Sequence, residues 1–319
     1  MKKTLMLLLA AAIVGAGVTP TDVVAATKKK AVAAKKKAPG AAKPHRVKKV
    51  VRARSTHRIA SLDDAQHLAL QSSAALVLDQ TTGAILFEKN SSAVLPIASI
   101  TKLMTAMVVL DARPDLNEKL AIGEEDVDIL KGTRSRLKVG THLAREEMLR
   151  LALMSSENRA AAALSRNYPG GREAFIVAMN HKAQALGLGD TRFQDATGLT
   201  AANVSSPRDL AKMVDAAHQY PLIREFSTTS AGEFSIAGRP QQFRNTNTLV
   251  KNPTWEIGLS KTGYINEAGK CLVMQAWLNN KPTIIVLLDS WGKMTRIGDA
   301  NRIKRWVESA SLAQRQSAG

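Results

Sequence analysis

The strand-like segments of this chain fall near both ends of its folded part, and mostly helical sequence separates them. Five segments rich in branched and apolar residues are typical of β-strands: residues 74–79, 84–88, 256–265, 271–278 and 283–288. Apolar residues recur at helical spacing in four other stretches, around residues 100–108, 148–152, 175–186 and 297–307. Because two strands alone would not be stable, we predict that both sets join one sheet. The sequence therefore predicts an α+β fold with an antiparallel sheet of about five strands flanked by helices, and a mostly helical subdomain inserted at about 110–230.

The N-terminus has the three parts of a secretory signal peptide. Lys2 and Lys3 precede an apolar run from Leu5 to Val14, and small residues follow at 24–26. The run is too short to anchor the chain in a bilayer. We therefore expect residues 1–26 to be a cleaved signal peptide, the mature protein to be periplasmic, and no transmembrane segment.

The next segment, residues 27–58, contains 13 basic residues and no acidic one. Its like charges repel and it offers few large apolar side chains, so it is expected to be a disordered linker. The net charge of +18 falls to +4 on residues 59–319, which form the expected catalytic domain. The linker is expected either to contact an anionic surface such as phospholipid, lipopolysaccharide or cell-wall polymer, or to be a solvated spacer. Since the charge lies in a tail, nucleic acid is not an expected partner.

Histidine and cysteine usage argues against metal chemistry. The six histidines show no ligand spacing, and there is no glycine-rich phosphate loop. The single cysteine, Cys271, excludes an intramolecular disulfide and a Cys-rich zinc site. We expect no metal and no cofactor. A serine nucleophile activated by a lysine is one arrangement that needs neither.

The motif S-x-x-K places a serine and a lysine on one face of a helix, one turn apart. It occurs three times, at Ser99 and Lys102, at Ser135 and Lys138, and at Ser290 and Lys293. Ser99 begins an apolar helix, so Lys102 projects among apolar neighbours, where its pKa should fall. The second pair lies in a charged stretch and the third at a strand end, which predicts exposed serines with solvated lysines. Ser99 is therefore the candidate nucleophile and Lys102 its base.

The motif S-x-N occurs twice. The first copy, Ser156 and Asn158, follows an apolar stretch at a break in the pattern, where a loop could direct both side chains into a cleft. The second copy, Ser165 and Asn167, falls inside a helical run and is interpreted as chance. Only the first copy is a candidate for the site.

The motif K-T-G occurs once, at residues 261–263 on a strand-like segment. Lys261 adds a positive charge and Thr262 a hydroxyl group. Gly263 has no side chain, so a substrate backbone can approach closely. These properties suit a strand along which a substrate binds.

Taken in order, residues 96–104, 156–158 and 261–263 resemble the three active-site motifs of penicillin-binding proteins and serine β-lactamases. The likeness extends to residues 151–162, 195–213 and 245–274, and covers about 74–306. Within this group the chain is most similar to the low-molecular-mass D-alanyl-D-alanine peptidases, and among them to the endopeptidases of the penicillin-binding protein 7 type. The resemblance implies the β-lactamase/transpeptidase-like fold.

The resemblance also implies catalytic roles. Ser99 should attack the D-alanyl carbonyl to form an acyl-enzyme while Lys102 takes its proton. Ser156 and Lys261 should relay or stabilise that proton. The positive charge of Lys261 should help to keep Lys102 neutral.

Substrate-binding roles follow from the same resemblance. Asn158 should hydrogen-bond the peptide backbone of the substrate, and Thr262 a substrate carboxylate or its β-lactam equivalent. Gly263 belongs to the same strand. The backbone amides of Ser99 and Tyr264 should form the oxyanion hole.

The expected substrate is the D-alanyl–diaminopimelyl cross-link of peptidoglycan, with β-lactam antibiotics as inhibitors. Carboxypeptidases of this group usually carry a further β-rich domain and an anchoring helix, whereas only 56 residues follow Gly263 here. A D-alanyl-D-alanine carboxypeptidase and a β-lactamase remain alternatives, although no glutamate motif identifies a deacylating base. A non-catalytic cell-wall-binding protein that acts through its basic tail is the alternative from another class.

Overall fold

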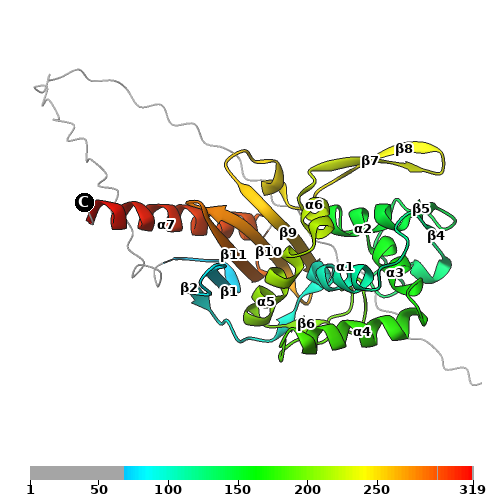
Figure 1. The fold of residues 1–319 in the computed structure, drawn as a ribbon, viewed down its shortest axis with the longest axis horizontal. Helices are drawn as coiled ribbons and strands as arrows, with labels where there is room; N and C mark the ends of the chain where they lie inside the picture. The colour runs from blue at the N-terminus through cyan, green and yellow to red at the C-terminus, as the bar shows by residue number, and fades with distance from the viewer. Residues whose placement is uncertain (1–67, 293, 318–319) are drawn as a thin grey trace, which may run out of the picture. The chain divides into compact units, whose positions relative to one another are not determined.

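The strands of the main sheet that come first and last along the chain pair with each other. Strand β1 (Ser72–Asp79) runs antiparallel to β11 (Lys281–Ser290), with Val77 opposite Ile285. The complete order is β2-β1-β11-β10-β9, where β2 is Ile85–Lys89, β9 is Glu256–Ile265 and β10 is Gly269–Leu278. Figure 1 shows β1 and β2, from the start of the described residues, in one sheet with β9, β10 and β11. The predicted five-stranded antiparallel sheet is confirmed.

The computed structural model describes residues 68–292 and 294–317. The expected signal peptide (1–26) and basic linker (27–58) lie outside the described residues, and so does Lys293. None of the described helices combines the length and apolar character that crossing a membrane requires.

The turn between β10 and β11 is tighter than the four residues, 279–282, expected from the sequence. Only Asn279 and Asn280 connect the strands, and their φ angles are 51° and 60°. Asparagine tolerates this left-handed conformation, which two-residue hairpin turns require. Lys281 and Pro282 therefore belong to β11.

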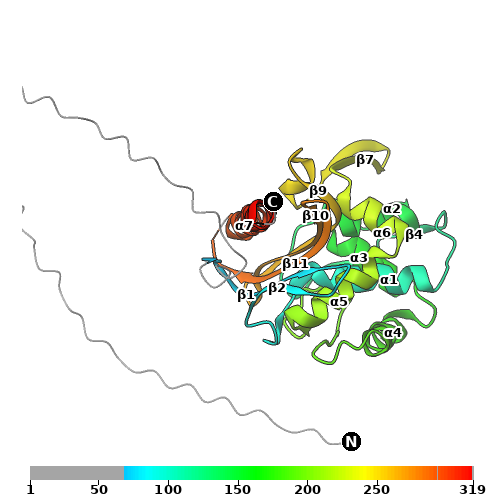
Figure 2. The same ribbon diagram turned by 60° about the vertical axis from the view of Figure 1, so that its left-hand side comes forward.

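Helices occupy the sequence between β2 and β9. They are α1 (Thr101–Asp111), α2 (Arg145–Met154), α3 (Asn158–Arg166), α4 (Gly171–Ala185), α5 (Pro207–His218) and α6 (Pro221–Thr228). The last helix, α7 (Thr295–Ser317), follows β11. Figure 2 shows α7 on one face of the sheet and the other helices on the opposite face. Side chains of the strands alternate between these faces, so the sheet contributes to two cores.

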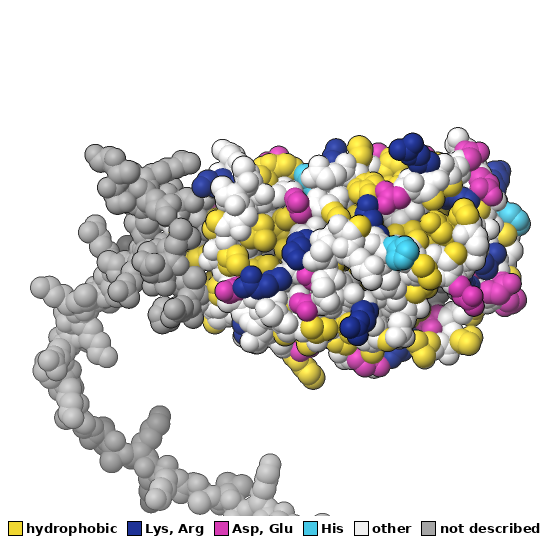
Figure 3. All heavy atoms as spheres, turned by 60° about the horizontal axis from the view of Figure 1, so that its bottom comes forward, with side chains coloured by type: hydrophobic (Ala, Val, Ile, Leu, Met, Phe, Trp, Pro, Cys, Tyr) yellow, Lys and Arg dark blue, Asp and Glu magenta, His cyan; other side chains and the backbone are white. Residues whose placement is uncertain are grey.

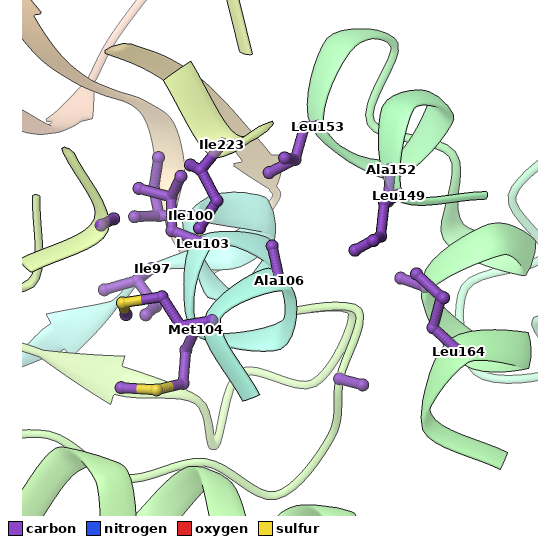
Figure 4. Packing of buried hydrophobic residues seen from close by; sticks show 14 of the residues in the cluster. Ile97, Ile100, Leu103, Met104, Ala106, Leu149, Ala152, Leu153, Leu164 and Ile223 are labelled. Carbon is purple, nitrogen blue, oxygen red and sulfur yellow. The ribbon is translucent and has the colours of Figure 1, made fainter. Parts of the chain in front are cut away.

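The two cores differ in size and partner. On the face of α7, Leu272 and Met274 of β10 pack with Ile303 and Trp306. On the other face, Val273 joins a larger core built around α1. Nine of the eleven residues of α1 are buried, and Lys102 is one of them. Figure 4 shows Ile100, Leu103 and Met104 of this region among side chains from neighbouring helices.

Three small two-stranded sheets were not predicted. Strands β3 (Leu95–Pro96) and β6 (Val204–Ser205) pair beside α1, and β4 (Lys119–Ala121) pairs with β5 (His142–Ala144). The hairpin of β7 (Ala231–Ile236) and β8 (Arg239–Arg244) precedes β9. In Figure 3, basic and acidic side chains are interspersed on the visible face, in keeping with the nearly balanced charge of residues 59–319.

Candidate active site

Ser99 and Lys102 lie where the sequence predicts them, at the entry to the buried helix α1. Ser99 belongs to the 3₁₀ turn η2 (Ala98–Ile100), and Lys102 to the first turn of α1. The Nζ of Lys102 lies 2.8 Å from the Oγ of Ser99. Lysine side chains are normally exposed, but that of Lys102 is fully buried.

The other two partners of Lys102 determine where its proton-accepting lone pair points. Its Nζ also donates to the Oδ1 of Asn158 at 2.8 Å and to the carbonyl oxygen of Thr197 at 2.7 Å. Both of these atoms only accept hydrogen bonds. A neutral amine has two N–H groups and one lone pair, so the lone pair must face the third partner, the hydroxyl of Ser99. This is the geometry of a base beside a nucleophile.

Burial lowers the pKa of Lys102 from its usual 10.5 to about 7, and the negative charges of Asp195 and Glu157 act in the opposite direction. An appreciable fraction of Lys102 is therefore neutral at neutral pH. The two lysines repel each other: the positive charge of Lys102 adds to burial, the largest cause, in lowering the pKa of Lys261.

Ser156 and Lys261 form a second pair from opposite sides of the site. Ser156 lies between α2 and α3 with a φ of 62°, and Lys261 lies on the edge strand β9. The Nζ of Lys261 donates to the Oγ of Ser156 at 2.9 Å and to the carbonyl oxygen of Thr262 at 3.0 Å. Lys261 is also buried. Two lysines with lowered pKa values thus face two serines, which allows protons to move through hydroxyl groups.

Asn158 lies within the site, but its side chain is already engaged. Its Oδ1 accepts from Lys102, and its Nδ2 donates to the Oγ1 of Thr133 at 3.0 Å. The resemblance implied contact with a substrate backbone. In the structure Asn158 also orients the base, a function that the motif spacing did not indicate.

The K-T-G strand passes directly beside the nucleophile. A Cβ atom on Gly263 would lie 2.8 Å from the carbonyl oxygen of Ile97 and 3.2 Å from the amide nitrogen of Ser99. Only glycine allows this approach. Tyr264 comes next in the strand, with its ring more than half exposed and its hydroxyl bonded to Asn266. The amides of Ser99 and Tyr264 therefore belong to backbone segments that are in contact.

Thr262 lies on the same strand and is almost completely buried. Its Oγ1 donates to the Oγ1 of Thr246 at 2.6 Å. Thr246 itself is exposed. Its hydroxyl therefore connects Thr262 to the outer surface of the site.

The loop at residues 195–199 was not predicted as part of the site. Its Gly198 has a φ of 79°, and a Cβ atom there would lie 2.0 Å from the carbonyl oxygen of Ala98. The carboxylate of Asp195 accepts hydrogen bonds from the amides of Thr197 and Gly198 and from the hydroxyl of Thr197. This holds the carbonyl of Thr197 toward Lys102. The only sequence signal was the likeness of this segment to the D-alanyl-D-alanine peptidases.

Arg296 of α7 is a second residue that sequence reasoning missed. Its Nη1 donates to the carbonyl oxygen of Gly263 at 2.8 Å and to that of Cys271 at 3.2 Å. No ion pair forms between Arg296 and another described residue. Burial lowers its pKa from the usual value, and its charge acts on Lys261. It supplies a positive charge behind the K-T-G strand that a substrate carboxylate could use.

Among the remaining motif copies, two contain a serine that is not exposed as predicted. Ser290 is buried and bonds to Ser72, because β11 pairs with β1 at that point. Ser135 is half-buried and donates to the Oε2 of Glu157 at 2.7 Å. Ser165 bonds to a carbonyl of its own helix, which supports reading this copy as chance.

Metal ligands do not cluster in the part of the chain that the structure describes: it contains no group of three or more histidine, cysteine, aspartate or glutamate side chains placed to hold an ion.

Comparisons with known sequences point to one group of proteins. A family model described as D-alanyl-D-alanine carboxypeptidase matches residues 61–292. The chain is 51% identical over 247 residues to the D-alanyl-D-alanine endopeptidase of Pseudomonas aeruginosa, which covers 76% of this chain and 79% of that protein. It is 47% identical over 257 residues to the D-alanyl-D-alanine endopeptidase of Escherichia coli, with 80% and 83% covered.

Solved structures give the same result. The crystal structure of a Streptomyces DD-transpeptidase matches with a TM-score of 0.70 and 28% identity, covering 75% of this chain and 97% of that one. A penicillin-binding protein from Listeria monocytogenes in its ampicillin-bound form matches with a TM-score of 0.65 and 27% identity, covering 75% and 98%. The fold is therefore the one that the motifs implied.

Proposed function

The chain belongs to the D-alanyl-D-alanine carboxypeptidase family of serine peptidases, and we propose that it is an endopeptidase that cleaves D-alanyl–diaminopimelyl cross-links of peptidoglycan. The observation that carries the catalytic part is the 2.8 Å contact between the Oγ of Ser99 and the Nζ of Lys102, a buried lysine whose pKa is lowered to about 7. The endopeptidase part is supported by the two relatives at 51% and 47% identity, both named endopeptidases. Relatives named carboxypeptidases are 28–32% identical.

Acylation begins at Ser99. Its Oγ attacks the D-alanyl carbonyl as its proton passes to the Nζ of Lys102, and the amides of Ser99 and Tyr264 stabilise the oxyanion. The amide bond then breaks, and the amine of the diaminopimelyl residue needs a proton to leave. The hydroxyl of Ser156, held by Lys261, supplies that proton. The proton that Lys102 took from Ser99 then replaces it on Ser156.

Water completes the cycle by hydrolysing the Ser99 ester. Lys102 takes a proton from the water as it attacks, and Ser99 recovers its hydroxyl. With a β-lactam the leaving amine stays tethered to the acyl group, so the ester persists. The same site is therefore acylated by β-lactams and released slowly.

Thr262 and Arg296 are the proposed recognition elements for the carboxylate next to the scissile bond. Thr262 offers a hydroxyl, and the guanidinium group of Arg296 lies behind Gly263. Asn158, which lies across the site from the K-T-G strand, is proposed to contact the substrate backbone. A carboxylate bound by a hydroxyl and a cation gains charge-assisted hydrogen bonds.

We further propose that residues 1–26 are the signal peptide, 27–58 the basic linker and 59–319 the peptidase domain, with a helical subdomain at about 110–230. A signal peptide of this kind directs the enzyme to the periplasm, where its substrate lies.

The decisive test compares the wild-type protein with Ser99→Ala on purified cross-linked muropeptides. The wild type should convert dimers to monomers, and the variant should leave them intact. In parallel, intact mass after incubation with benzylpenicillin should show a stable adduct on the wild type alone. Rapid loss of penicillin without an adduct would favour a β-lactamase, and binding to cell wall without cleavage would favour a non-catalytic protein.

A further inference from the structure

A small pocket opens beside the K-T-G strand, outside the catalytic machinery described above. Its volume is about 150 Å³, and it lies where β8 ends and the 3₁₀ turn η4 (Thr248–Lys251) begins. The residues that line it are Ser230, Arg244, Asn245, Asn247, Thr248, Val250 and Lys251. Six of these seven side chains are polar or charged, which suits a polar ligand.

The walls of this pocket are held by asparagine side chains. The Nδ2 of Asn245 donates to the carbonyl oxygens of Ser227 and Thr229, both at 2.9 Å. The side chain of Asn247 accepts from the amide of Leu249 and donates to the Oγ of Ser260 on β9. Since these bonds fix the backbone, the pocket is formed before a ligand arrives.

The pocket adjoins the proposed carboxylate site through one residue. Thr246 lies between the two pocket asparagines in the chain, and its hydroxyl accepts the hydrogen bond from Thr262. The amide of Thr246 donates to the carbonyl oxygen of Met154, two residues before Ser156. A substrate that reaches Thr262 and continues along the outer edge of β9 therefore meets this pocket next.

Charge indicates what the pocket binds. Arg244 and Lys251 are both exposed, and within the described residues neither forms an ion pair or a side-chain hydrogen bond. No acidic residue lines the pocket. Two uncompensated cations beside hydroxyl and amide groups favour an anion, and a guanidinium group suits a carboxylate in particular.

We propose that Arg244 and Lys251 form a subsite for carboxylates of the acceptor peptide in a peptidoglycan cross-link. The inference rests on the endopeptidase function proposed above. In a carboxypeptidase substrate the leaving group is a single D-alanine, whose only carboxylate is bound at Thr262. In a cross-link the leaving group is a whole peptide, which continues past that carboxylate and carries further ones. The subsite would thus discriminate a cross-link from a free D-alanyl-D-alanine terminus.

The test pairs an enzyme variant with a substrate variant. The double variant Arg244→Gln/Lys251→Gln should lose about tenfold in kcat/KM on a cross-linked muropeptide dimer, since each exposed charge contact contributes modestly. Its acylation by benzylpenicillin and its hydrolysis of a short D-alanyl-D-alanine peptide should not change. Arg239→Gln is the matched control for the single variant Arg244→Gln, because each removes one positive charge from β8, at positions about 17 Å apart.

Amidating only the further carboxylates of the acceptor peptide, and not the one bound at Thr262, should cost the wild type the same factor and cost the double variant almost nothing, because the interaction is then already absent. If wild type and double variant cleave the dimer equally, or if amidation slows both equally, the subsite is wrong and the endopeptidase function stands. If the wild type is acylated by benzylpenicillin but leaves the dimer intact, both proposals fail. A tenfold loss also seen with Arg239→Gln would mean a general charge effect and would overturn the subsite.

Discussion

The Nζ of Lys102 lies 2.8 Å from the Oγ of Ser99, and its two other hydrogen-bond partners are groups that only accept. The contact with Ser99 is therefore the one through which Lys102 can take up a proton. Because burial lowers the pKa of this lysine to about 7, the proton is taken up by a group that is partly neutral at the working pH. Nucleophile and base are thus in position before substrate binds.

Acylation by benzylpenicillin should depend on pH with an acid limb near pH 7. Lys102 is protonated below its lowered pKa and cannot take the proton of Ser99, so the rate should rise as pH increases through about 7. The second-order acylation rate, followed by intact mass from about pH 5 to pH 9, measures this. A rate that is constant across that range would contradict the assignment of Lys102 as base.

Replacing Lys102 by arginine should remove most activity at every pH. Arginine keeps the positive charge but does not lose its proton, so the base is lost, and general-base catalysis is typically worth ~10²–10⁴ in rate. Lys138→Arg is the matched control, because Lys138 occupies the same place in another S-x-x-K motif and is exposed. Comparable acylation by Lys102→Arg and Lys138→Arg would show that Lys102 is not the base.

Asp195→Asn should move the acid limb to lower pH. The negative charge of Asp195 raises the pKa of Lys102, so removing it should lower that pKa further and leave more of the lysine neutral. The maximal rate should fall as well, since hydrogen bonds from the loop are lost. Thr197→Val removes a hydroxyl from the same loop without changing charge, and it should lower the rate without moving the limb. An unmoved limb in Asp195→Asn would leave Asp195 with a structural function only.

Gly198→Ala should prevent acylation and destabilise the protein. The new Cβ would lie 2.0 Å from the carbonyl oxygen of Ala98 and 2.9 Å from the amide of Ser99. Gly187→Ala is the control: it also has a positive φ, but no atom lies within 4 Å of the new Cβ. Backbone strain alone should lower the free energy of unfolding of Gly187→Ala by ~1–2 kcal/mol. Overpacking should lower that of Gly198→Ala by a further ~1–3 kcal/mol. Thermal unfolding and the penicillin adduct measure the two effects, and equal Tm losses would refute the clash.

Deleting residues 27–58 should weaken binding to anionic vesicles or cell wall and leave hydrolysis of a small soluble peptide unchanged. The deleted segment carries 13 basic residues and no acidic one, so the attraction should weaken as salt increases. Co-sedimentation with vesicles at low and high salt measures binding. Equal binding with and without residues 27–58 at low salt would mean that this segment is only a spacer.

Local sequence was sufficient for much of the fold. The strands at 256–265 and 271–278 were predicted almost to the residue, because branched and apolar side chains are concentrated between clear turn signals. The hairpin β7–β8 was missed because its alternation is weak: Arg239 and Gln242 are exposed, and only Phe243 of β8 is buried. The prediction that Ser290 is exposed was wrong, because the end of a strand was assessed without the partner strand that covers it.

The contact between Ser99 and Lys102 was set by the sequence itself, since three residues along a helix bring two side chains to one face whatever surrounds them. The contact of Lys261 with Ser156 joins residues 105 positions apart, and no local pattern predicts it. The same is true of Thr197 beside Lys102 and Arg296 behind Gly263. Burial, which lowers the pKa of both lysines, also arises only when helices and sheet close over them. The sequence alone thus determined which groups could do chemistry, whereas their distances and protonation were decided by long-range packing, because both depend on neighbours that the chain brings together only when it folds.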